Sequence, residues 1–124
     1  MAKILVIDDD PSVRASLEQA LKSADHSVAL AVNGLDGMKQ HGTQPADLIL
    51  VDLFMPTQDG VETIIQLRKL EPNVRIIAIS GNVLSSTVLP VAQKLGAVAV
   101  LEKPFAVDQL LKTVDNALAS KKRG

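Results

Sequence analysis

Short runs of apolar residues alternate along this chain with longer segments in which apolar residues recur at helical spacing. We expect the runs to form five strands: Lys3–Ile7, Val28–Val32, Asp47–Val51, Val74–Ile79 and Ala97–Leu101. Helices are expected near residues 11–21, 34–41, 61–70, 86–95 and 107–120. Because the strands are apolar on both faces, they favour a parallel sheet that is covered by helices on both sides.

The number of strand–helix units decides between the common parallel architectures. Five units are too few for an eight-stranded barrel, so the pattern predicts an α/β fold with a doubly wound, five-stranded open sheet. No linker or internal repeat interrupts the pattern, and we expect one domain over residues 1–124. In open sheets of this kind, ligands bind beyond the carboxyl ends of the strands, where the strand order reverses.

The composition excludes several classes of function. The 124 residues include no cysteine, which excludes disulfides, thiolate metal sites and thiol catalysis. A net charge of −1 and an aromatic content of 2% argue against direct binding of nucleic acid by charge or by stacking. No apolar run approaches the ~20 residues of a membrane span. Since the amino terminus also carries charge, we expect no membrane insertion and a cytoplasmic location.

Charge is divided unevenly between the two halves of the chain. Residues 1–60 carry nine acidic and four basic side chains, whereas residues 61–124 carry nine basic and five acidic ones. Chance, together with the basic run Lys121–Arg123, is one explanation. The alternative is an acidic site that is built from the first half of the chain.

The residues that end or follow the strands are the most informative. Asp8 and Asp9 follow the first strand, Asp52 follows the third, and Ser80 and Lys103 come after the fourth and fifth. All of them should meet at one edge of a parallel sheet. Three crowded carboxylates repel one another unless a cation lies between them, and oxygen ligands suit Mg²⁺, which also accepts phosphate oxygens. With a hydroxyl and an ammonium nearby, one carboxylate can accept a phosphoryl group as an aspartyl phosphate.

Each of these residues alone has a simpler explanation. An aspartate after a strand is usually a turn or helix-capping residue, and that is the interpretation favoured for Asp10 before Pro11. Ser80 alone would indicate a turn, and Lys103 alone a surface position. The coincidence of all these side chains at one sheet edge is what favours a phosphoryl site.

Four segments together resemble the receiver domain of two-component response regulators: ILVIDDD, VDLFMPTQDG, IAISGN and LEKPF. They stand in the order and at the spacing of that family, with 43 residues from Asp9 to Asp52, 28 from there to Ser80 and 23 from there to Lys103. The resemblance covers essentially the whole chain. It implies a single-domain, chemotaxis-regulator-like protein or an isolated receiver domain, with the flavodoxin-like (βα)₅ fold and strand order 2-1-3-4-5.

The resemblance also implies roles for the polar residues. Asp52 matches the phosphoacceptor of the family, while Ser80 and Lys103 match the hydroxyl and the lysine that contact the phosphoryl group. Pro104 matches the cis-peptide position of the family, which predicts a cis bond between Lys103 and Pro104.

A magnesium site is implied by the same comparison. Asp8, Asp9 and Asp52 match its carboxylate ligands, with Asp9 as the direct ligand of the acidic pair, and the backbone carbonyl of Phe54 matches the third protein ligand. The chain would then accept a phosphoryl group from a histidine kinase or phosphotransfer protein, with Mg²⁺ required, and change the surface that an unknown output protein contacts. It would catalyse only its own phosphorylation and dephosphorylation, as a monomer or weak dimer.

Two positions depart from the family pattern. Val100 stands three residues before Lys103, where the family usually has the aromatic ring that rotates inward on activation. We therefore expect activation to appear as a backbone shift of residues 81–90. Phe54 stands two residues after Asp52, where a small or polar residue is usual, and its ring should slow self-dephosphorylation by excluding water.

Three alternatives compete with this interpretation. A degenerate receiver that acts as a constitutive interaction module is disfavoured by the complete set of polar residues. A phosphatase with an aspartate nucleophile would need a second aspartate at the position of Phe54. A flavin carrier would need a phosphate-cradling loop after the first strand, where Asp8–Asp10 would repel the phosphate.

Overall fold

The computed structural model describes residues 2–53, 60–81, 90 and 93–119. The elements are β1 (Lys3–Ile7), α1 (Pro11–Ser23), β2 (Ser27–Ala31), α2 (Gly34–Thr43), β3 (Leu48–Asp52), α3 (Gly60–Leu70), β4 (Ile76–Ser80), β5 (Ala99–Glu102) and α5 (Val107–Ala119). The strands form one parallel sheet in the order β2-β1-β3-β4-β5. The predicted α/β architecture and its strand order are therefore confirmed.

The element boundaries lie within two residues of the predicted ones, and β1 coincides with its prediction. The fourth apolar run begins at Val74, but β4 begins at Ile76, because Val74 is buried in a turn in which its N–H donates to the carbonyl of Glu71 at 3.1 Å. Burial made this turn residue indistinguishable from a strand residue in the sequence. The helix expected over residues 86–95 falls mostly outside the described residues. Within it, Pro90, Gln93 and Lys94 are described and helical.

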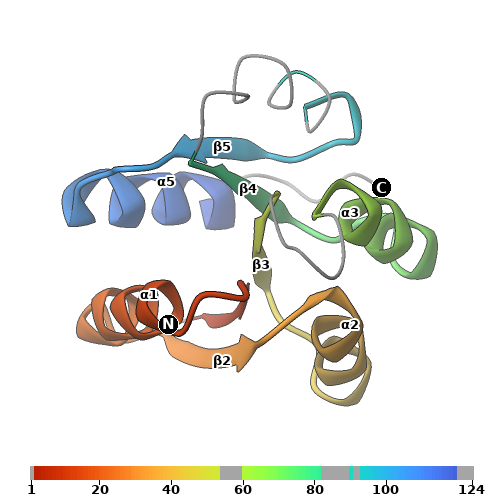
Figure 1. Cartoon of the computed structure of the whole chain (residues 1–124), viewed down its shortest axis with the longest axis horizontal. Helices are drawn as coiled ribbons and strands as arrows, with labels where there is room; N and C mark the ends of the chain where they lie inside the picture. Colours follow the sequence, from red (N-terminus) through yellow and green to blue (C-terminus); the bar gives the residue numbers. More distant parts are fainter. Residues whose placement is uncertain (1, 54–59, 82–89, 91–92, 120–124) are drawn as a thin grey trace.

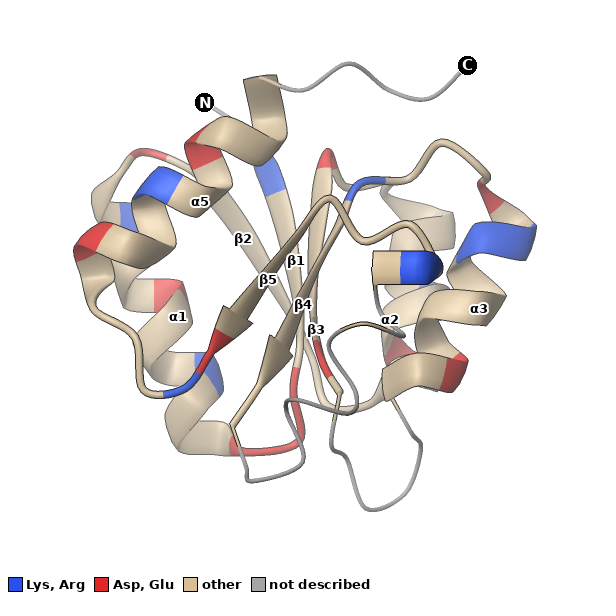
Figure 2. Cartoon of the chain, turned by 90° about the horizontal axis from the view of Figure 1, so that it is seen from above, with Lys and Arg blue, Asp and Glu red and all other residues tan. Residues whose placement is uncertain are grey.

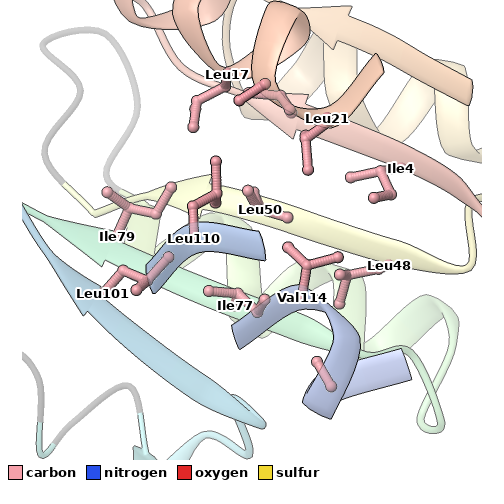
Figure 3. Packing of buried hydrophobic residues seen from close by; sticks show 13 residues of the cluster. Ile4, Leu17, Leu21, Leu48, Leu50, Ile77, Ile79, Leu101, Leu110 and Val114 are labelled. Carbon is pink, nitrogen blue, oxygen red and sulfur yellow. The ribbon is translucent and has the colours of Figure 1, made fainter. Parts of the chain in front are cut away.

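Two helical layers enclose the sheet. Helices α1 and α5 cover one face and α2 and α3 cover the other (Figure 1). Alternate residues of each strand serve the two layers: Ile4 of β1 lies in the cluster under α1 and α5, whereas Leu5 lies in the cluster under α2 and α3. Figure 3 shows the first cluster, in which Leu17 and Leu110 reach the sheet from the two helices. Because side chains alternate between the two faces, each apolar strand contributes to both cores. The polar residues at the strand ends lie outside these two cores.

The start of α1 is set by residues that the sequence already indicated. Asp10 is the N-cap, with its side chain accepting a hydrogen bond from the N–H of Ser12 at 2.8 Å, and Pro11 occupies the first helical position. This confirms the capping interpretation of Asp10. Gly96 has a φ of +92°, which confirms the left-handed conformation expected where the preceding helical segment ends.

Side chains of α2 cover the outer edge of the sheet at β2. The N–H of Val32 donates to Asp36 Oδ2 at 3.1 Å, and Gln40 Nε2 donates to the carbonyl of Leu30 at 2.7 Å. Both backbone groups point away from β1, which pairs with β2 through the intervening residues. Asp36 and Gln40 thereby occupy two of the hydrogen-bonding positions that a sixth strand would use.

Candidate functional site

The polar residues that end the strands meet at one edge of the sheet. Asp52 is the last residue of β3 and Ser80 the last of β4, while Asp8 and Lys103 directly follow β1 and β5. Figure 2 shows acidic residues at the carboxyl ends of both β1 and β3. This shared edge follows from parallel pairing, because Ile7 is in register with Val51, and Asp52 with Ile79.

The carboxylates and the ammonium lie within interaction distance of one another. Asp8, Asp9 and Asp52 each offer an oxygen, and these three oxygens lie within 4.8 Å of one another. Lys103 Nζ donates to Asp52 Oδ2 at 3.2 Å and lies 3.6 Å from Asp8 Oδ2. Asp8 and Asp52 are buried, with exposed fractions of 1% and 5%, whereas Asp9 is partly exposed. The site is therefore a buried acidic pair with one outer carboxylate and one cation.

The backbone of neighbouring strands places Lys103. Its N–H donates to the carbonyl of Ser80 at 2.7 Å, and its peptide bond to Pro104 is cis, as predicted. Gly81 leaves room for the aliphatic stem, since a Cβ at that position would lie 2.7 Å from Lys103 Cδ. Ser80 itself is fully buried.

The backbone that carries Asp52 is held by a close approach of α3. The N–H of Leu53 donates to the carbonyl of Ile79 at 2.8 Å, and the N–H of Gly60 donates to the carbonyl of Leu53 at 3.2 Å. A Cβ on Gly60 would collide with the carbonyl oxygen of Asp52 and lie 2.5 Å from Leu53 Cα. Only glycine at this position lets α3 begin directly against the strand that ends in Asp52.

The electrostatics of the site follow from its burial. The pKa of Asp8 is raised from its usual 3.8 to about 6, with burial as the largest cause. The negative charge of Asp52 adds to the rise, while the N–H of Asp10 and the ammonium of Lys103 oppose it. For Lys103, burial alone would lower the pKa, but the charges of Asp52 and Asp8 outweigh burial and raise it above its usual value. Lys103 is therefore held in its charged form beside the two carboxylates.

One oxygen of the acidic pair has no hydrogen bond. Asp8 Oδ1 accepts from the N–H of Asp10 at 2.9 Å, but Asp8 Oδ2 is buried without a hydrogen-bond partner in the described part of the chain. A buried carboxylate oxygen facing two other carboxylates is suited to a hard divalent cation. The donor set therefore fits Mg²⁺, with Asp8, Asp9 and Asp52 as the residues that would hold it.

Three expectations concern residues near this site. Phe54, whose carbonyl was expected to bind the metal and whose ring was expected to limit water, lies outside the described residues. The backbone shift expected for residues 81–90 falls largely outside them as well. Val100 is half-buried, pairs with Ala78 in the sheet and packs against the cluster under α2 and α3.

Sequence reasoning missed one contact of the acidic segment. Arg14 of α1 donates from Nη1 to the backbone carbonyl of Asp8 at 2.7 Å. The only signal in the sequence was a basic residue in the first turns of a helix, where the helix dipole disfavours a cation.

The sequence matches the response regulator receiver domain over residues 4–115. The chain belongs to this family. It is 30% identical over 118 residues to the chemotaxis protein CheY of Listeria monocytogenes, covering 94% of this chain and 98% of that protein. It is 35% identical over 119 residues to the transcriptional regulator NtrC of Azospirillum brasilense, covering 96% of this chain but only 24% of the relative. The receiver chain thus spans about a quarter of NtrC and nearly all of CheY.

Solved receiver structures share the fold. A CheY-like receiver domain protein from Methanospirillum hungatei superimposes with a TM-score of 0.88 at 26% identity, covering 95% of this chain and 94% of that one. CheY4 of Vibrio cholerae gives a TM-score of 0.87 at 28% identity, covering 94% and 98%. As a receiver domain, the chain is a phosphorylation-dependent signalling switch of two-component systems. No helix among the described residues is long and apolar enough to cross a membrane.

Proposed function

We propose that this receiver accepts a phosphoryl group on Asp52 from a phosphohistidine of a histidine kinase or phosphotransfer protein, in a reaction that requires Mg²⁺. The observation that carries the proposal is the contact of Lys103 Nζ with Asp52 Oδ2 at 3.2 Å, beside two further carboxylates within 4.8 Å. A purely structural ion pair would need one carboxylate for one ammonium. The second and third carboxylates support a role of the site in holding a cation.

The transfer step uses the carboxylate of Asp52 as nucleophile. One of its oxygens forms the bond to phosphorus while the bond from phosphorus to the imidazole nitrogen breaks, and the leaving imidazole keeps the electron pair. Lys103 is placed to neutralise charge on the phosphoryl oxygens, and Ser80 is proposed to donate its hydroxyl to one of them. Mg²⁺, held by Asp8, Asp9, Asp52 and, as the family implies, the carbonyl of Phe54, would neutralise the charge that develops during in-line transfer.

The phosphorylated site is proposed to act on the protein surface through Ser80 and Lys103. Both are tied to the sheet, since the N–H of Lys103 donates to the carbonyl of Ser80. A change in the ammonium or hydroxyl position therefore reaches the ends of β4 and β5. An output protein that recognises the altered surface would complete the switch.

The experiment is phosphorylation by acetyl phosphate with and without Mg²⁺, followed by intact mass measurement. We expect wild type to gain the mass of one phosphoryl group only with Mg²⁺, and Asp52→Asn to gain none, because an amide is not a nucleophile of the needed charge. Asp115→Asn, on the exposed side of α5, is the matched control and should react like wild type. Phosphorylation of Asp52→Asn at the wild-type level would refute the assignment.

A further inference from the structure

Arg14 is the one basic residue of α1 that contacts the acidic segment after β1. It lies in the first turns of α1, is partly buried, and donates from Nη1 to the carbonyl oxygen of Asp8 at 2.7 Å. The other basic residue of this helix, Lys22, lies in the last turn and pairs with Glu18 at 3.1 Å. The two therefore form a natural pair for comparison.

The location of Arg14 is electrostatically unusual. The N-terminal end of a helix carries partial positive charge, so a cation there is disfavoured, and the first turn of α1 contains no acidic residue to balance it. The balance comes instead from the three consecutive aspartates that precede the helix, Asp8–Asp10. A long side chain that is fixed at this place must make a contact that offsets its lost freedom.

The hydrogen bond of Arg14 restrains a part of the turn that the neighbouring hydrogen bonds leave unrestrained. The bond from the N–H of Asp10 to Asp8 Oδ1 restrains the Asp8 side chain, and the bond from the N–H of Ser12 to Asp10 Oδ1 restrains the helix start. Arg14 instead holds the carbonyl of Asp8, and with it the peptide plane that joins Asp8 to Asp9. The orientation of this plane sets the direction in which Asp9 leaves the backbone.

We propose that Arg14 is a positioning residue for the metal site, which holds the peptide group between Asp8 and Asp9 so that both carboxylates face Asp52. The proposal rests on the proposed function, because it concerns the Mg²⁺ that phosphorylation requires. Residues that orient metal ligands without touching the metal typically change metal affinity by tenfold or more when they are removed.

Charge and positioning predict opposite results for the loss of Arg14. If the guanidinium acted only through its charge, its removal would strengthen Mg²⁺ binding, because a cation near the site repels another cation. If it acts by positioning, its removal weakens binding, because the two carboxylates no longer share one fixed orientation. The sign of the change therefore separates the two roles.

The test is the Mg²⁺ dissociation constant, measured by isothermal titration calorimetry on the full chain at one pH and ionic strength. We expect Arg14→Ala to weaken binding roughly tenfold, and Arg14→Lys, which keeps a donor and the charge, to recover most of the loss. Lys22→Ala removes the same charge from the same helix and should leave the constant unchanged.

A second readout excludes a purely structural effect. In phosphorylation by acetyl phosphate at increasing Mg²⁺, Arg14→Ala should need more Mg²⁺ for half the maximal rate but reach the wild-type rate at saturation. A variant that was only less stable would lose maximal rate without needing more Mg²⁺. That pattern, or equal or tighter Mg²⁺ binding by Arg14→Ala, would overturn the inference alone. A wild-type chain that binds no Mg²⁺ would overturn the proposed function together with the inference.

Discussion

Charged or titratable side chains are buried both at the amino ends of the strands (the amino edge) and at their carboxyl ends (the carboxyl edge). The two edges differ in how completely these side chains are hydrogen-bonded. At the amino ends of the strands, His41 is buried between two partners: its Nδ1 accepts from the N–H of Ala46 at 3.0 Å, and its Nε2 donates to Glu71 Oε1 at 2.6 Å. Both ring nitrogens are therefore used. At the carboxyl ends, Asp8 is as deeply buried but leaves one oxygen without a hydrogen bond in the described part of the chain.

Arg68 strengthens the contrast from the same amino edge. It lies at the end of α3 and donates to three backbone carbonyls: from Nε to Leu95 at 3.2 Å, from Nη1 to Pro72 at 2.8 Å, and from Nη2 to Gly96. These bonds join α3 to the turn before β4 and to the segment before β5. The forked guanidinium satisfies carbonyls that would otherwise need other donors.

This comparison shows that the two ends of the strands are suited to different purposes, the amino edge to stability and the carboxyl edge to function. Buried polar groups stabilise when every partner is present and destabilise when one is missing. At the amino edge, His41 and Arg68 have their hydrogen-bond partners without a ligand, so both contribute to folding, although Arg75 Nε, directly before β4, is buried without a hydrogen-bond partner in the described part of the chain. The carboxyl edge keeps three carboxylates near one ammonium, which is unfavourable until a cation binds. The predictions below test this contrast, from the largest effect to the smallest.

Substitution of glycine should have opposite effects at the two edges. Gly60→Ala places a Cβ against the backbone of Asp52 and Leu53, and should lower the free energy of unfolding by about 3 kcal/mol, because backbone atoms cannot move aside as a side-chain tip can. Gly42→Ala in α2 meets no atom within 4 Å and should raise it by about 0.5–1 kcal/mol. Urea unfolding of both variants is the measurement. Equal stability of the two would show that α3 does not press on the site.

Removal of Arg68 should destabilise the protein through the amino edge. We expect Arg68→Ala to lower the free energy of unfolding by about 2–3 kcal/mol, since three carbonyls lose a charged donor. Arg68→Lys should recover only part of the loss, because an ammonium lacks the fork. Lys69→Ala is the control at the exposed neighbouring position and should change little. Denaturant midpoints at constant slope would give the stability of all three variants. If Arg68→Ala lost no more stability than Lys69→Ala, the three hydrogen bonds of Arg68 would not stabilise the amino edge.

Removal of the Asp8 charge should stabilise the protein. Asp8→Asn in EDTA at pH 7 should raise the free energy of unfolding by about 1–3 kcal/mol. A neutral amide avoids the cost of burying a negative charge, which is the main cause that raises the pKa of Asp8 to about 6. Glu71→Gln at the amino edge should have the opposite sign, since it weakens a completed hydrogen bond to His41. Thermal or urea unfolding of both variants tests the contrast directly. Destabilisation by Asp8→Asn would break it.

The pH dependence should show the same contrast as a smaller effect. Because the pKa of Asp8 is raised on folding, its protonated form stabilises the folded state at low pH, and this contribution is lost as pH rises from about 4 through about 6. The stability difference between Asp8→Asn and wild type should therefore be small near pH 4, grow up to about pH 6 and stay level above it. Unfolding curves at four or five pH values, without metal, measure it. If the stability difference between Asp8→Asn and wild type did not change with pH, the effect of the variant would not come from the charge of Asp8.

The fold and the meeting of the strand-end residues were predictable from sequence for one reason. Parallel pairing brings every carboxyl end to one edge, so the positions of Asp8, Asp52 and Lys103 at the ends of apolar runs already placed them together. The hydrogen bonds of Arg14 and Arg68 to backbone carbonyls were not predictable, because they depend on long side chains that reach backbone atoms outside their own helices. Arg68 and Leu95 are instead joined only by the way α3 packs beside the segment before β5.

 The separation of 27 residues between Arg68 and Leu95 carries no local signal. Val74 shows the same limit in the opposite direction, because a buried turn residue has the same sequence appearance as a strand residue.

The hydrogen bonds between α2 and the edge strand β2 have a consequence for aggregation at high protein concentration. An open strand edge invites the strands of other molecules, and such pairing can grow without a natural end. Here two of the groups that an incoming strand would use, the N–H of Val32 and the carbonyl of Leu30, are already engaged by Asp36 and Gln40. A visiting strand would have to displace a carboxylate and an amide that also contact each other at 3.3 Å. Asp36 and Gln40 of α2 thus hinder the addition of a strand at this edge.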